Sequence, residues 1–567
     1  MNLRHVLTVI ACALALATSI SAQQNAMPSD EAIRAILRTR IDTEARGVGI
    51  VVGVVEPGGR RVIAHGSFGA KDPRPVDGDT LFEIGSITKV FTSLLLADMA
   101  GRGEVQLNDP VAKYLPASVR VPDRDGREIT LQDLATHTSG LPRLPTNLVV
   151  TSPDNPYANY NVERLYEFLS GHTLSRAIGA QYEYSNLGGG LLGHALALRA
   201  GSDYESLART RIFAPLGMND TTIRMSLTMS SRLAAGHDPQ RGPAGNWDFT
   251  TALAGAGAIR STANDMMRFV AAFMGSDKQP FSAAAARMLS VQRPGPGPGS
   301  SAALGWIVTT RDDLTMVWHG GATGGYSAFA GYIPARGTGV VLSNMAATPA
   351  VSPDDIGMHL LDERFPLSRP QAARTRITLP TEILQRYVGR YELAPGFIAT
   401  VTLEGGRLFV QPSNQPRHEI HAEAEREFFA TLVDAQFTFE VDASGKAVAM
   451  VLHQAGRNVS GKRLTDGAAS APPASRPHIT LEPAVLDQYV GRYQLTAAMF
   501  ITVTREDTRL FAQASGQGRF ELFAEAPERF FADVGGIEIA FDRDGGGRAT
   551  SLTIRQAGTA FQLKRVE

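Results

Sequence analysis

The stretch FEIGSITKVF (residues 82–91) holds a serine, Ser86, three positions before a lysine, Lys89. The apolar spacing after Ser86 and the glycine at Gly101 predict a helix that begins at Ser86. Residues i and i+3 share one face of a helix, so the Lys89 amine is expected beside the Ser86 hydroxyl. A lysine whose pKa is lowered can activate a serine as a nucleophile. The two residues are therefore a candidate nucleophile and base, although serine is also a common helix N-cap.

Two later stretches carry polar groups that suit the same chemistry. YEYSNLGGGLLG (residues 182–193) contains Tyr184, which can relay a proton, and Asn186, whose amide can hold a lysine or a substrate carbonyl. WHGGATGG (residues 318–325) contains His319 followed by two glycines, which allow a substrate backbone to lie against a strand edge. Each stretch also has an ordinary interpretation: a loop with a core tyrosine in the first, and a β-bulge or turn in the second.

The large region around these motifs is predicted to be one domain, residues 23–365. A helix is expected over residues 29–46 with Ser29 as its N-cap, followed by a strand over residues 47–56. Residues 317–346 are typical of late strands of the same sheet. Strands at both ends with helices between them predict a mixed α/β (α+β) fold, with an antiparallel sheet flanked by helices.

The three motifs, in this order, resemble those of the serine hydrolases of the penicillin-binding protein and class C β-lactamase superfamily. The general pattern is S-x-x-K, then Y-x-N, then a basic or aromatic residue followed by T/G-G. Further segments look like that superfamily as well: LATHTSGLP (residues 134–142), PLGM (residues 215–218) and GAGAIRSTANDMMRF (residues 255–269). The resemblance covers residues 30 to 360 approximately, and it implies a β-lactamase/transpeptidase-like domain.

The resemblance also implies roles for individual residues. Ser86 would be the nucleophile, and Lys89 and Tyr184 would share the proton transfers. The expected substrate-binding residues are Asn186, His319, Gly321 and Ala322. Among these, Asn186 would orient the lysine and the substrate amide, and the backbone N–H groups of Ser86 and Ala322 would form the oxyanion hole. The implied reaction acylates Ser86 through a tetrahedral intermediate, and water then hydrolyses the acyl-enzyme.

The third motif departs from the commonest form of the superfamily, in which many β-lactamases and carboxypeptidases carry a lysine where this chain has His319. Histidine is mostly neutral at pH 7, so a fixed cation for a β-lactam or C-terminal carboxylate is less secure here. The His-Gly-Gly form is more similar to D-aminopeptidases, some esterases and other divergent peptidases. A D-aminopeptidase relative also bears two small C-terminal β-barrels.

The remainder of the chain is an internal repeat. YVGRY occurs at residues 387–391 and again 102 positions later at residues 489–493, and RLF, FFA and QAG recur at the same offset. Short alternating strands with turn signals predict that each copy, residues 377–465 and residues 479–567, is a small antiparallel, lipocalin-like β-barrel. An Ala-, Pro- and Ser-rich linker at residues 466–477 joins the copies. The YVGRY tyrosines are expected to pack inside each barrel, with a ligand pocket there as the alternative.

The N-terminus is typical of a secretory signal, residues 1–22, with an uncleaved anchor as the alternative. Its apolar run is shorter than the 20 residues or so that span a membrane, and small residues follow it. The single cysteine, Cys12, lies inside it, so the mature chain would have no disulfide and no thiol chemistry. A periplasmic or secreted protein, with no integral membrane segment after cleavage, is therefore expected. The net charge of −1 gives no field that would attract nucleic acid.

Together these features predict an exported serine hydrolase that cleaves an amide bond in a D-amino-acid peptide or a β-lactam. Its substrate is expected to be a small molecule or a peptide, with peptidoglycan-derived peptides among the candidates. The chain has no motif for a nucleotide cofactor or a metal, so no cofactor is expected. Two alternatives stay open: a carboxylesterase of small acyl esters, and a binding protein that is acylated without turnover. The oligomeric state and the role of the barrels are not determined, and one hypothesis is that the barrels restrict substrate size.

Two histidine signals favour structural roles. His137, in THTSGLP, is interpreted as tying a loop to the backbone rather than as a catalytic group. His418 and His421 have a spacing that suggests a metal pair, but side chains three positions apart on a strand point to opposite faces. The second repeat has Phe520 and Phe523 at these positions, so packing is the better interpretation.

Overall fold

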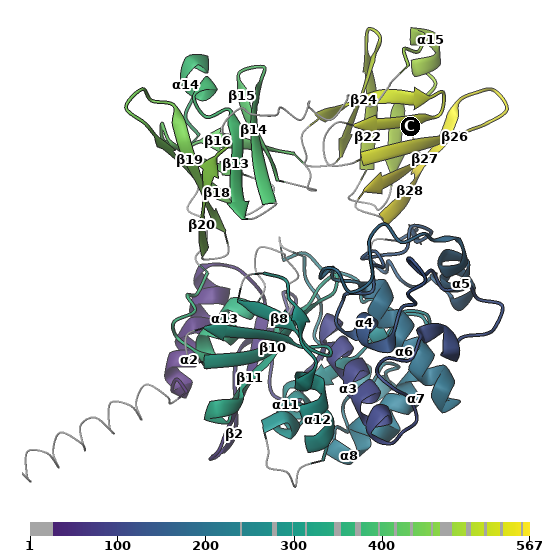
Figure 1. Ribbon diagram of the computed structural model, residues 1–567, viewed down its shortest axis with the longest axis vertical. Coiled ribbons are helices and arrows are strands. Elements are labelled where there is room, and N and C mark those ends of the chain that lie inside the picture. Colours follow the sequence, from purple (N-terminus) through teal and green to yellow (C-terminus); the bar gives the residue numbers. More distant parts are fainter. Residues whose placement is uncertain are drawn as a thin grey trace, which may run out of the picture. The chain divides into compact units, whose positions relative to one another are not determined.

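The structure is a computed structural model in which the chain divides into two compact units (Figure 1). The first unit comprises Met1–Arg143 and Tyr157–Leu367, and the second comprises Leu144–Pro156 and Ser368–Glu567. The structure describes residues 27–566 except 153, 239–240, 275–279, 298, 312–313, 345–352, 369–375, 395–396, 413–416, 431–434, 455–456, 465–478, 495–499, 515–518, 533–536 and 557–558. The signal segment with Cys12 and the linker between the repeats lie outside the described residues.

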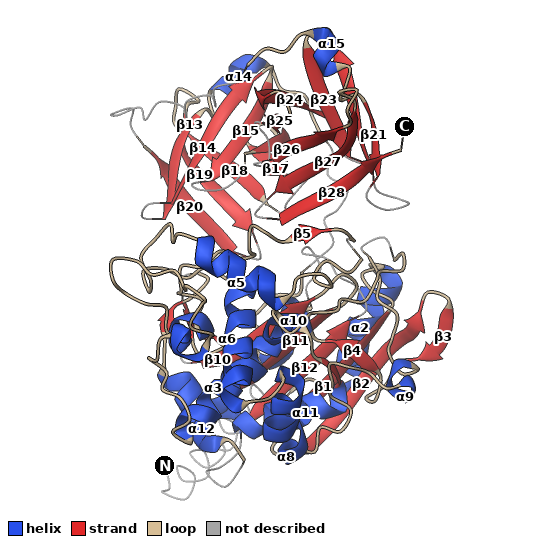
Figure 2. Ribbon diagram, turned by 90° about the vertical axis from the view of Figure 1, so that its right-hand side faces the viewer, coloured by secondary structure: helices blue, strands red, loops and turns tan. Residues whose placement is uncertain are grey.

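The first unit is built on a nine-stranded sheet in which all neighbouring strands run antiparallel (Figure 2). The order across the sheet is β3 (Asp72–Pro75), β2 (Gly59–Gly69), β1 (Gly49–Glu56), β12 (Thr338–Asn344), β11 (Ser327–Ile333), β10 (Leu314–Ala322), β9 (Ile307–Arg311), β8 (Ser300–Ala302) and β7 (Arg293–Pro294). The early and late strands join where β1 pairs with β12, which confirms the predicted antiparallel sheet. A separate pair is formed by β4 (Leu81–Glu83) and β6 (Arg260–Thr262).

The helices of the first unit lie between the early and late strands in the sequence, with one at each end. They are α2 (Asp30–Arg38), α3 (Thr88–Gly101), α4 (Leu131–Ala135), α5 (Val162–Gly171), α6 (Asn186–Ala200), α7 (Tyr204–Ala208), α8 (Ala214–Leu216), α9 (Leu227–Ser230), α10 (Ala254–Gly257), α11 (Ala263–Met274), α12 (Ser282–Ser290) and α13 (Asp354–Leu361). Short turns of other helix types are η1 (Thr39–Thr43), η2 (Gly85–Ile87), η3 (Val111–Tyr114), η4 (Arg209–Phe213) and η5 (Pro334–Arg336).

Both faces of the sheet centre are covered, and β1 shows how. Its residues Ile50, Val52 and Val54 belong to a core cluster with side chains of α2 and α13. Gly53, which points to the other face, lies so close to Met267 of α11 that a β-carbon there would be 2.6 Å from the Met267 side chain. A strand buried on both faces needs an almost continuous apolar run, which is what the sequence of β1 provides.

The first helix is shorter than its sequence pattern predicts. Ser29 is its N-cap, as expected, and its hydroxyl accepts a hydrogen bond from the Ala32 N–H. The α-helix ends at Arg38 and a π-helical turn, η1, follows it. Within that turn Arg40 is buried and donates two hydrogen bonds to Asp355 at the start of α13. This ion pair joins residues 315 positions apart, so the local pattern could not show it.

Each repeat in the second unit folds as a closed barrel of eight antiparallel strands, as predicted. The first consists of α14 (Thr381–Gln385), β13 (Gly389–Ala394), β14 (Phe397–Glu404), β15 (Arg407–Pro412), β16 (His418–Ala422), β17 (Glu427–Ala430), β18 (Gln436–Val441), β19 (Ala447–Gln454) and β20 (Arg457–Arg463). The second consists of α15 (Pro483–Leu486), β21 (Gly491–Gln494), β22 (Phe500–Glu506), β23 (Arg509–Ala514), β24 (Arg519–Ala526), β25 (Arg529–Ala532), β26 (Ile537–Arg543), β27 (Ala549–Gln556) and β28 (Thr559–Arg565). A two-residue strand, β5 (Val149–Val150), pairs in parallel with β28.

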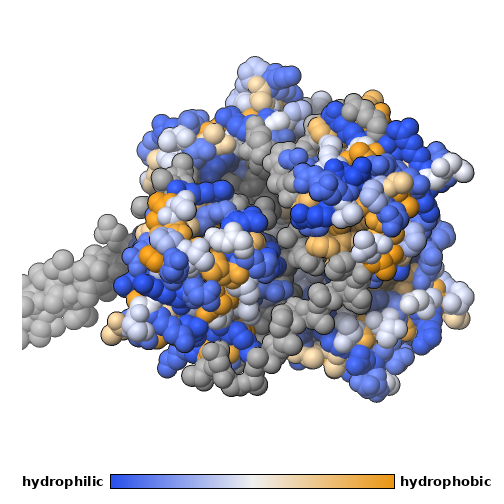
Figure 3. All heavy atoms as spheres, turned by 90° about the horizontal axis from the view of Figure 1, so that it is seen from above, coloured by the Kyte–Doolittle hydropathy of each residue, from blue (hydrophilic) through white to orange (hydrophobic). Residues whose placement is uncertain are grey.

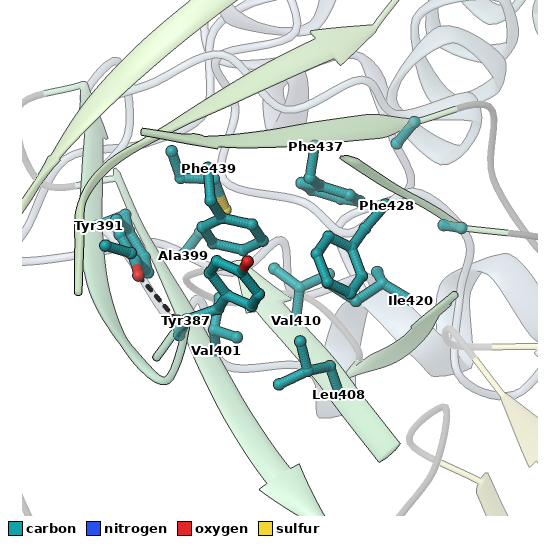
Figure 4. Packing of buried hydrophobic residues seen from close by; sticks show 14 of the residues in the cluster. Tyr387, Tyr391, Ala399, Val401, Leu408, Val410, Ile420, Phe428, Phe437 and Phe439 are labelled. Atoms are coloured by element: carbon teal, nitrogen blue, oxygen red, sulfur yellow. Dashed lines mark hydrogen bonds between the residues drawn. The ribbon is translucent and has the colours of Figure 1, made fainter. Parts of the chain in front are cut away.

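The YVGRY tyrosines pack inside their barrels, as expected. Tyr387 and Tyr391 lie among buried aliphatic and aromatic side chains in the first barrel (Figure 4). The Tyr391 hydroxyl donates to the Tyr387 carbonyl oxygen at 2.7 Å, and Tyr493 does the same to Tyr489 in the second barrel at 2.8 Å. Buried tyrosines need such partners for their hydroxyl groups. The tyrosines thus fill the barrel interior, and the hydroxyl groups of Tyr391 and Tyr493 also hydrogen-bond to the backbone.

Hydrophilic residues predominate on the face shown in Figure 3, where hydrophobic residues occur in small groups. Scattered exposed apolar side chains are normal on folded proteins. In the described part of the chain, no helix combines the length and the apolar character that crossing a membrane requires.

Candidate active site

Ser86 is held where the end of β10 meets the turn that leads into α3. Gly85 has a left-handed φ of +50°, and a β-carbon on it would lie 2.6 Å from the backbone nitrogen of Ala322. A β-carbon on Gly321 would lie 2.0 Å from the carbonyl oxygen of Ile84. Only glycines permit this approach of backbone to backbone. The glycines therefore bring the Ala322 backbone beside the segment that carries Ser86.

Lys89 is the centre of a buried hydrogen-bond cluster. Its Nζ lies 3.1 Å from Ser86 Oγ, 2.8 Å from Asn186 Oδ1 and 2.8 Å from the carbonyl oxygen of Ala256. A neutral amine has two hydrogens and one lone pair. The amide oxygen and the carbonyl oxygen can only accept, so they take the two hydrogens. The lone pair is then left for the Ser86 hydroxyl, which is the arrangement that a general base requires.

Burial makes that neutral state accessible. The Lys89 side chain is 3% exposed, and this loss of hydration, together with repulsion by the charge of Arg143, holds its pKa well below the usual value for lysine. An amine with a lowered pKa loses its proton nearer to neutral pH. Lys89 can therefore accept the proton of Ser86 when the serine attacks a carbonyl carbon.

Helix α6 supplies the second motif and room for the lysine. Ser185 is its N-cap, accepting from the Gly188 N–H at 2.8 Å, and Asn186 is its first residue. A β-carbon on Gly189 would lie 3.0 Å from Lys89 Cε, so this glycine leaves space for the lysine stem. Glycines of α6 also let α10 approach, and α10 carries Ala256, the third partner of Lys89.

Tyr184 lies over the same cluster. Lys89 Nζ is 4.7 Å from the centre of its ring, and a side-chain hydrogen bond joins the phenol to Ser86. Burial raises the pKa of Tyr184, and the hydrogen bond with Ser86 opposes that rise only in part. The phenol therefore keeps its proton at neutral pH. It can donate that proton to a leaving group rather than act as the resting base.

His137 has the structural role that its sequence context favours. Its Nδ1 accepts a hydrogen bond from the Ser185 N–H at 3.1 Å, and its carbonyl oxygen accepts from the Glu183 N–H at 2.8 Å. Its ring packs against Tyr184 with the ring centres 4.4 Å apart. Burial holds the pKa of His137 well below its usual value, so the ring is neutral. His137 thus positions the Tyr184 loop.

His319 lies on β10, with its ring centre 6.1 Å from that of Tyr184. Burial, reinforced by repulsion from Lys89, lowers its pKa to about 4. The imidazole is therefore neutral at pH 7 and cannot serve as a fixed cation there. The structure thus brings Ser86, Lys89, Tyr184, Asn186, His319, Gly321 and Ala322 to one place.

Sequence reasoning missed three residues at this site. Ala256 acts through its carbonyl oxygen, which no side-chain pattern reveals, although it lies in GAGAIRSTANDMMRF, a segment that looks like the superfamily. The Tyr157 hydroxyl lies 3.4 Å from Asn186 Nδ2, and its ring stacks on Phe249 with centres 4.5 Å apart. Arg143, directly after THTSGLP, lies with its guanidinium carbon 5.2 Å from the centre of the Tyr184 ring. Its place immediately after that segment was the available signal.

Among the described residues, no group of three or more His, Cys, Asp and Glu side chains is placed to hold a metal ion. His418 and His421 both lie on β16, three positions apart. The His421 ring packs against Phe429 with ring centres 5.8 Å apart, in agreement with the packing interpretation.

A family model described as Beta-lactamase matches residues 31–361. The chain belongs to the beta-lactamase family. A second model, described as a domain of unknown function (DUF3471), matches residues 373–465 and residues 475–567, so each match covers one barrel. The family match confirms the resemblance to the penicillin-binding protein and class C β-lactamase superfamily.

Individual relatives of this beta-lactamase family protein agree. A D-alanyl-D-alanine-carboxypeptidase/endopeptidase, AmpH, of Escherichia coli (strain K12) is 35% identical over 305 residues, which cover 50% of this chain and 76% of the relative. Penicillin-binding protein 4* of Bacillus subtilis (strain 168) is 26% identical over 420 residues, or 68% of this chain and 89% of that protein. A solved beta-lactamase/D-alanine carboxypeptidase from Pseudomonas syringae is 20% identical with a TM-score of 0.50, covers 57% of this chain and 95% of that chain, and shares the fold. The chain is thus a serine hydrolase.

Proposed function

We propose that this serine hydrolase cleaves an amide bond, in a D-amino-acid peptide or a β-lactam, through an acyl-serine intermediate. The observation that carries the proposal is the position of Lys89 Nζ, 3.1 Å from Ser86 Oγ and 2.8 Å from each of two acceptors. The named activities of the relatives, D-alanyl-D-alanine carboxypeptidase and beta-lactamase, support an amide substrate.

The proposed reaction assigns each group one task. Lys89 takes the Ser86 proton while Ser86 Oγ forms a bond to the carbonyl carbon. The resulting oxyanion is held by the backbone N–H groups of Ser86 and Ala322. The carbon–nitrogen bond then breaks, and the leaving nitrogen receives a proton from the Tyr184 hydroxyl. The protonated Lys89 then returns a proton to Tyr184. Water hydrolyses the acyl-serine by the reverse sequence of proton transfers, which releases the acid and restores Ser86.

A carboxylesterase of small acyl esters is the second candidate function. It uses the same acylation chemistry and differs only in the leaving atom. The neutral state of His319 favours it, because the third motif then offers no cation for the carboxylate of a β-lactam or a D-alanyl peptide. A protein that is acylated without turnover differs from both only in the lifetime of the acyl-serine.

Intact-protein mass spectrometry tests these functions. The native chain and its Ser86→Ala variant are each mixed with penicillin, a D-alanyl-D-alanine peptide or p-nitrophenyl butyrate, and product release is followed in parallel. A matched control is Ser290→Ala, which removes an exposed hydroxyl at the end of α12. An adduct or product that depends on Ser86 supports the proposal, and the preferred substrate chooses among peptidase, lactamase and esterase. Absence of both with all three compounds would contradict an acyl-serine mechanism.

We further propose export, with removal of residues 1–22 and a periplasmic or secreted location. The charged start, the apolar run and the small residues that follow it support this proposal. The mass of the protein recovered from an expressing cell tests the cleavage of residues 1–22, since a mass that includes them would contradict it.

We also propose boundaries of residues 23–365, 377–465 and 479–567 for the three domains, and the ranges of the family matches support them.

A further inference from the structure

Arg143 is a cation anchored at the edge of the proposed site. Its carbonyl oxygen accepts hydrogen bonds from the N–H groups of Asn186 at 3.0 Å and Leu187 at 3.3 Å. Ser185 donates its hydroxyl hydrogen to the carbonyl oxygen of Pro142, the preceding residue, at 2.7 Å. The backbone of Arg143 is therefore tied to the start of α6, which carries Asn186. Its position relative to Ser86 and Lys89 is set by the same helix start.

The Arg143 side chain is exposed, and it reaches over the site. Its guanidinium carbon lies 5.2 Å from the centre of the Tyr184 ring. Its positive charge contributes to the lowered pKa of Lys89 and of His137, and it opposes the burial that raises the pKa of Tyr184. Repulsion of this kind falls off with distance. The guanidinium thus acts on the groups around Ser86.

The Arg143 charge is unpaired among the residues that the structure describes, with no carboxylate within 4.0 Å of it. Other arginines of the first unit are satisfied differently: Arg40 pairs with Asp355 at 2.6 Å, and Arg260 pairs with Glu83 at 3.0 Å. Those pairs join elements of the fold. An arginine beside a nucleophile that has no such partner is available to a ligand.

The availability of Arg143 to an anion is important because the third motif has no fixed cation at His319. Because its imidazole is neutral at pH 7, the third motif provides no positive charge. Lys89 is occupied by its acceptors and Tyr184 is protonated, so neither offers a fixed charge to a substrate. A guanidinium group is a cation at every physiological pH. Among the described residues around this cluster, Arg143 is therefore a side chain suited to bind an anion.

We propose that Arg143 binds a carboxylate of the substrate and makes the enzyme selective for anionic acyl donors. A guanidinium offers parallel N–H groups that match the two oxygens of a carboxylate. This assignment rests on the proposed acyl-serine function and extends it to the substrate class. Arg143 is a binding residue here, and the reaction steps at Ser86 stay as described. The carboxylate can belong to the acyl portion or to the leaving portion of the substrate.

Two matched substrate pairs distinguish those sources. The first pair, p-nitrophenyl hydrogen glutarate and p-nitrophenyl methyl glutarate, differs by a carboxylate on the acyl side. The second pair, N-acetyl-D-alanyl-D-alanine and its C-terminal amide, differs by a carboxylate on the leaving side. The quantity measured is the ratio of kcat/KM for the acid to kcat/KM for the neutral partner. In the native protein, that ratio is expected to exceed one for the pair that Arg143 recognises, and to fall as salt is added.

In Arg143→Ala the ratio for that pair is expected to fall about 10- to 100-fold, the loss of one charged hydrogen-bonded contact. Arg143→Lys is expected to retain part of the preference for the acid, since an ammonium group keeps the positive charge but lacks the parallel N–H groups of a guanidinium. Arg120→Ala removes an exposed arginine elsewhere in the first unit and is the matched control. An unchanged ratio for both pairs in Arg143→Ala, or an equal loss with acid and neutral partner, would overturn the proposal.

A binding measurement distinguishes a failure of the carboxylate site from a failure of the proposed acyl-serine function. Calorimetry with the Ser86→Ala variant measures the affinity for the acid and the neutral partner without any turnover, with Arg143 present or replaced by Ala. A preference for the acid that depends on Arg143 supports the carboxylate site even where no substrate is turned over. Equal affinities overturn it even where Ser86-dependent hydrolysis of the neutral ester upholds the acyl-serine mechanism.

Discussion

Gly321 and Ile84 lie backbone against backbone, and a β-carbon on Gly321 would come 2.0 Å from the Ile84 carbonyl oxygen. Real β-carbons do not approach an oxygen so closely, so one of the two segments must move if a side chain is added. Ile84 lies two residues before Ser86, and Gly321 lies one residue before Ala322. The contact therefore sets the spacing between the two backbone N–H groups that are proposed to hold the oxyanion.

Gly321→Ala is expected to lower kcat at least about 100-fold, because displacement of one oxyanion-hole donor has an effect of that size. Thermal unfolding should show a loss of about 1–3 kcal/mol from the same overpacking. Gly58→Ala is the control, since a β-carbon there meets nothing within 4 Å. A Gly321→Ala variant with native kcat and native thermal midpoint would show that the contact does not govern the site.

Replacement of Lys89 by Met tests the base. Methionine has a similar length and no amine, so kcat/KM is expected to fall by about 10²- to 10⁴-fold. Single-turnover acylation by p-nitrophenyl butyrate measures the step directly. Lys113→Met, at an exposed lysine of η3 that pairs with Asp109, is the matched control. Acylation of Lys89→Met at close to the native rate would mean that another group takes the Ser86 proton.

The lowered pKa of Lys89 should also make the free energy of unfolding depend on pH. Its folded-state pKa lies well below the unfolded value of 10.5, so between those two values the unfolded chain binds a proton that the folded chain lacks. The free energy of unfolding is therefore expected to rise with pH across that window, by up to about 1.4 kcal/mol per pH unit. Above the unfolded value the contribution levels off. Urea denaturation of the native protein and of Lys89→Met over this range tests it, and parallel curves would contradict the lowered pKa.

His319 is expected to titrate at about pH 4 rather than at its usual 6.5. Its ring signal in an NMR titration, assigned by its loss in His319→Gln, measures this. Because the folded-state pKa is the lower one, the unfolded chain binds more protons between these values, and stability is expected to rise with pH through that window. A ring that titrates near 6.5 would contradict the neutral state and would restore His319 as a candidate cation.

The two barrels offer a matched pair of variants. The Tyr391 hydroxyl is bound to the Tyr387 carbonyl at 2.7 Å, and the Tyr493 hydroxyl to the Tyr489 carbonyl at 2.8 Å, with both tyrosines fully buried. Tyr391→Phe and Tyr493→Phe each leave a buried carbonyl without its donor, which is expected to cost about 1–3 kcal/mol. Calorimetry should show similar losses in the two variants, with kcat/KM unchanged. Losses that differ severalfold would mean that the repeats are not equivalent inside.

The approach of Ser86 and Lys89 could be predicted from the sequence because it depends on local helical geometry, although Ser86 lies in the 3-10 turn η2 and the α-helix begins at Thr88 rather than at Ser86 as predicted. Residues three apart lie on one helix face whatever surrounds them. The repeat was predictable for a similar reason, since the YVGRY motifs and three further landmarks keep one offset of 102 residues. The hairpin turn at residues 404–406 also carries its own glycine signal, and β14 and β15 flank it.

The chemistry of the lysine could not be predicted in this way. Its acceptors, Asn186 and Ala256, lie 97 and 167 positions further along the chain, and the second acts through its backbone. Whether Lys89 is neutral depends on how deeply packing buries it, and local sequence does not encode burial. The same holds for the neutral ring of His319 and for Arg143, which has no carboxylate partner in the part of the chain that the structure describes.

The sequence by itself therefore determined the fold class, the barrel repeat and the candidate pair Ser86 and Lys89, because the motifs and their spacing along the chain carry that information. The tertiary structure alone decided the partners of Lys89, the close contact of Gly321 with Ile84 and the place of Arg143 beside Tyr184. These features depend on which segments, far apart in the sequence, pack against one another. That packing removes water from the groups, which shifts their pKa values, and it fixes the distances between them.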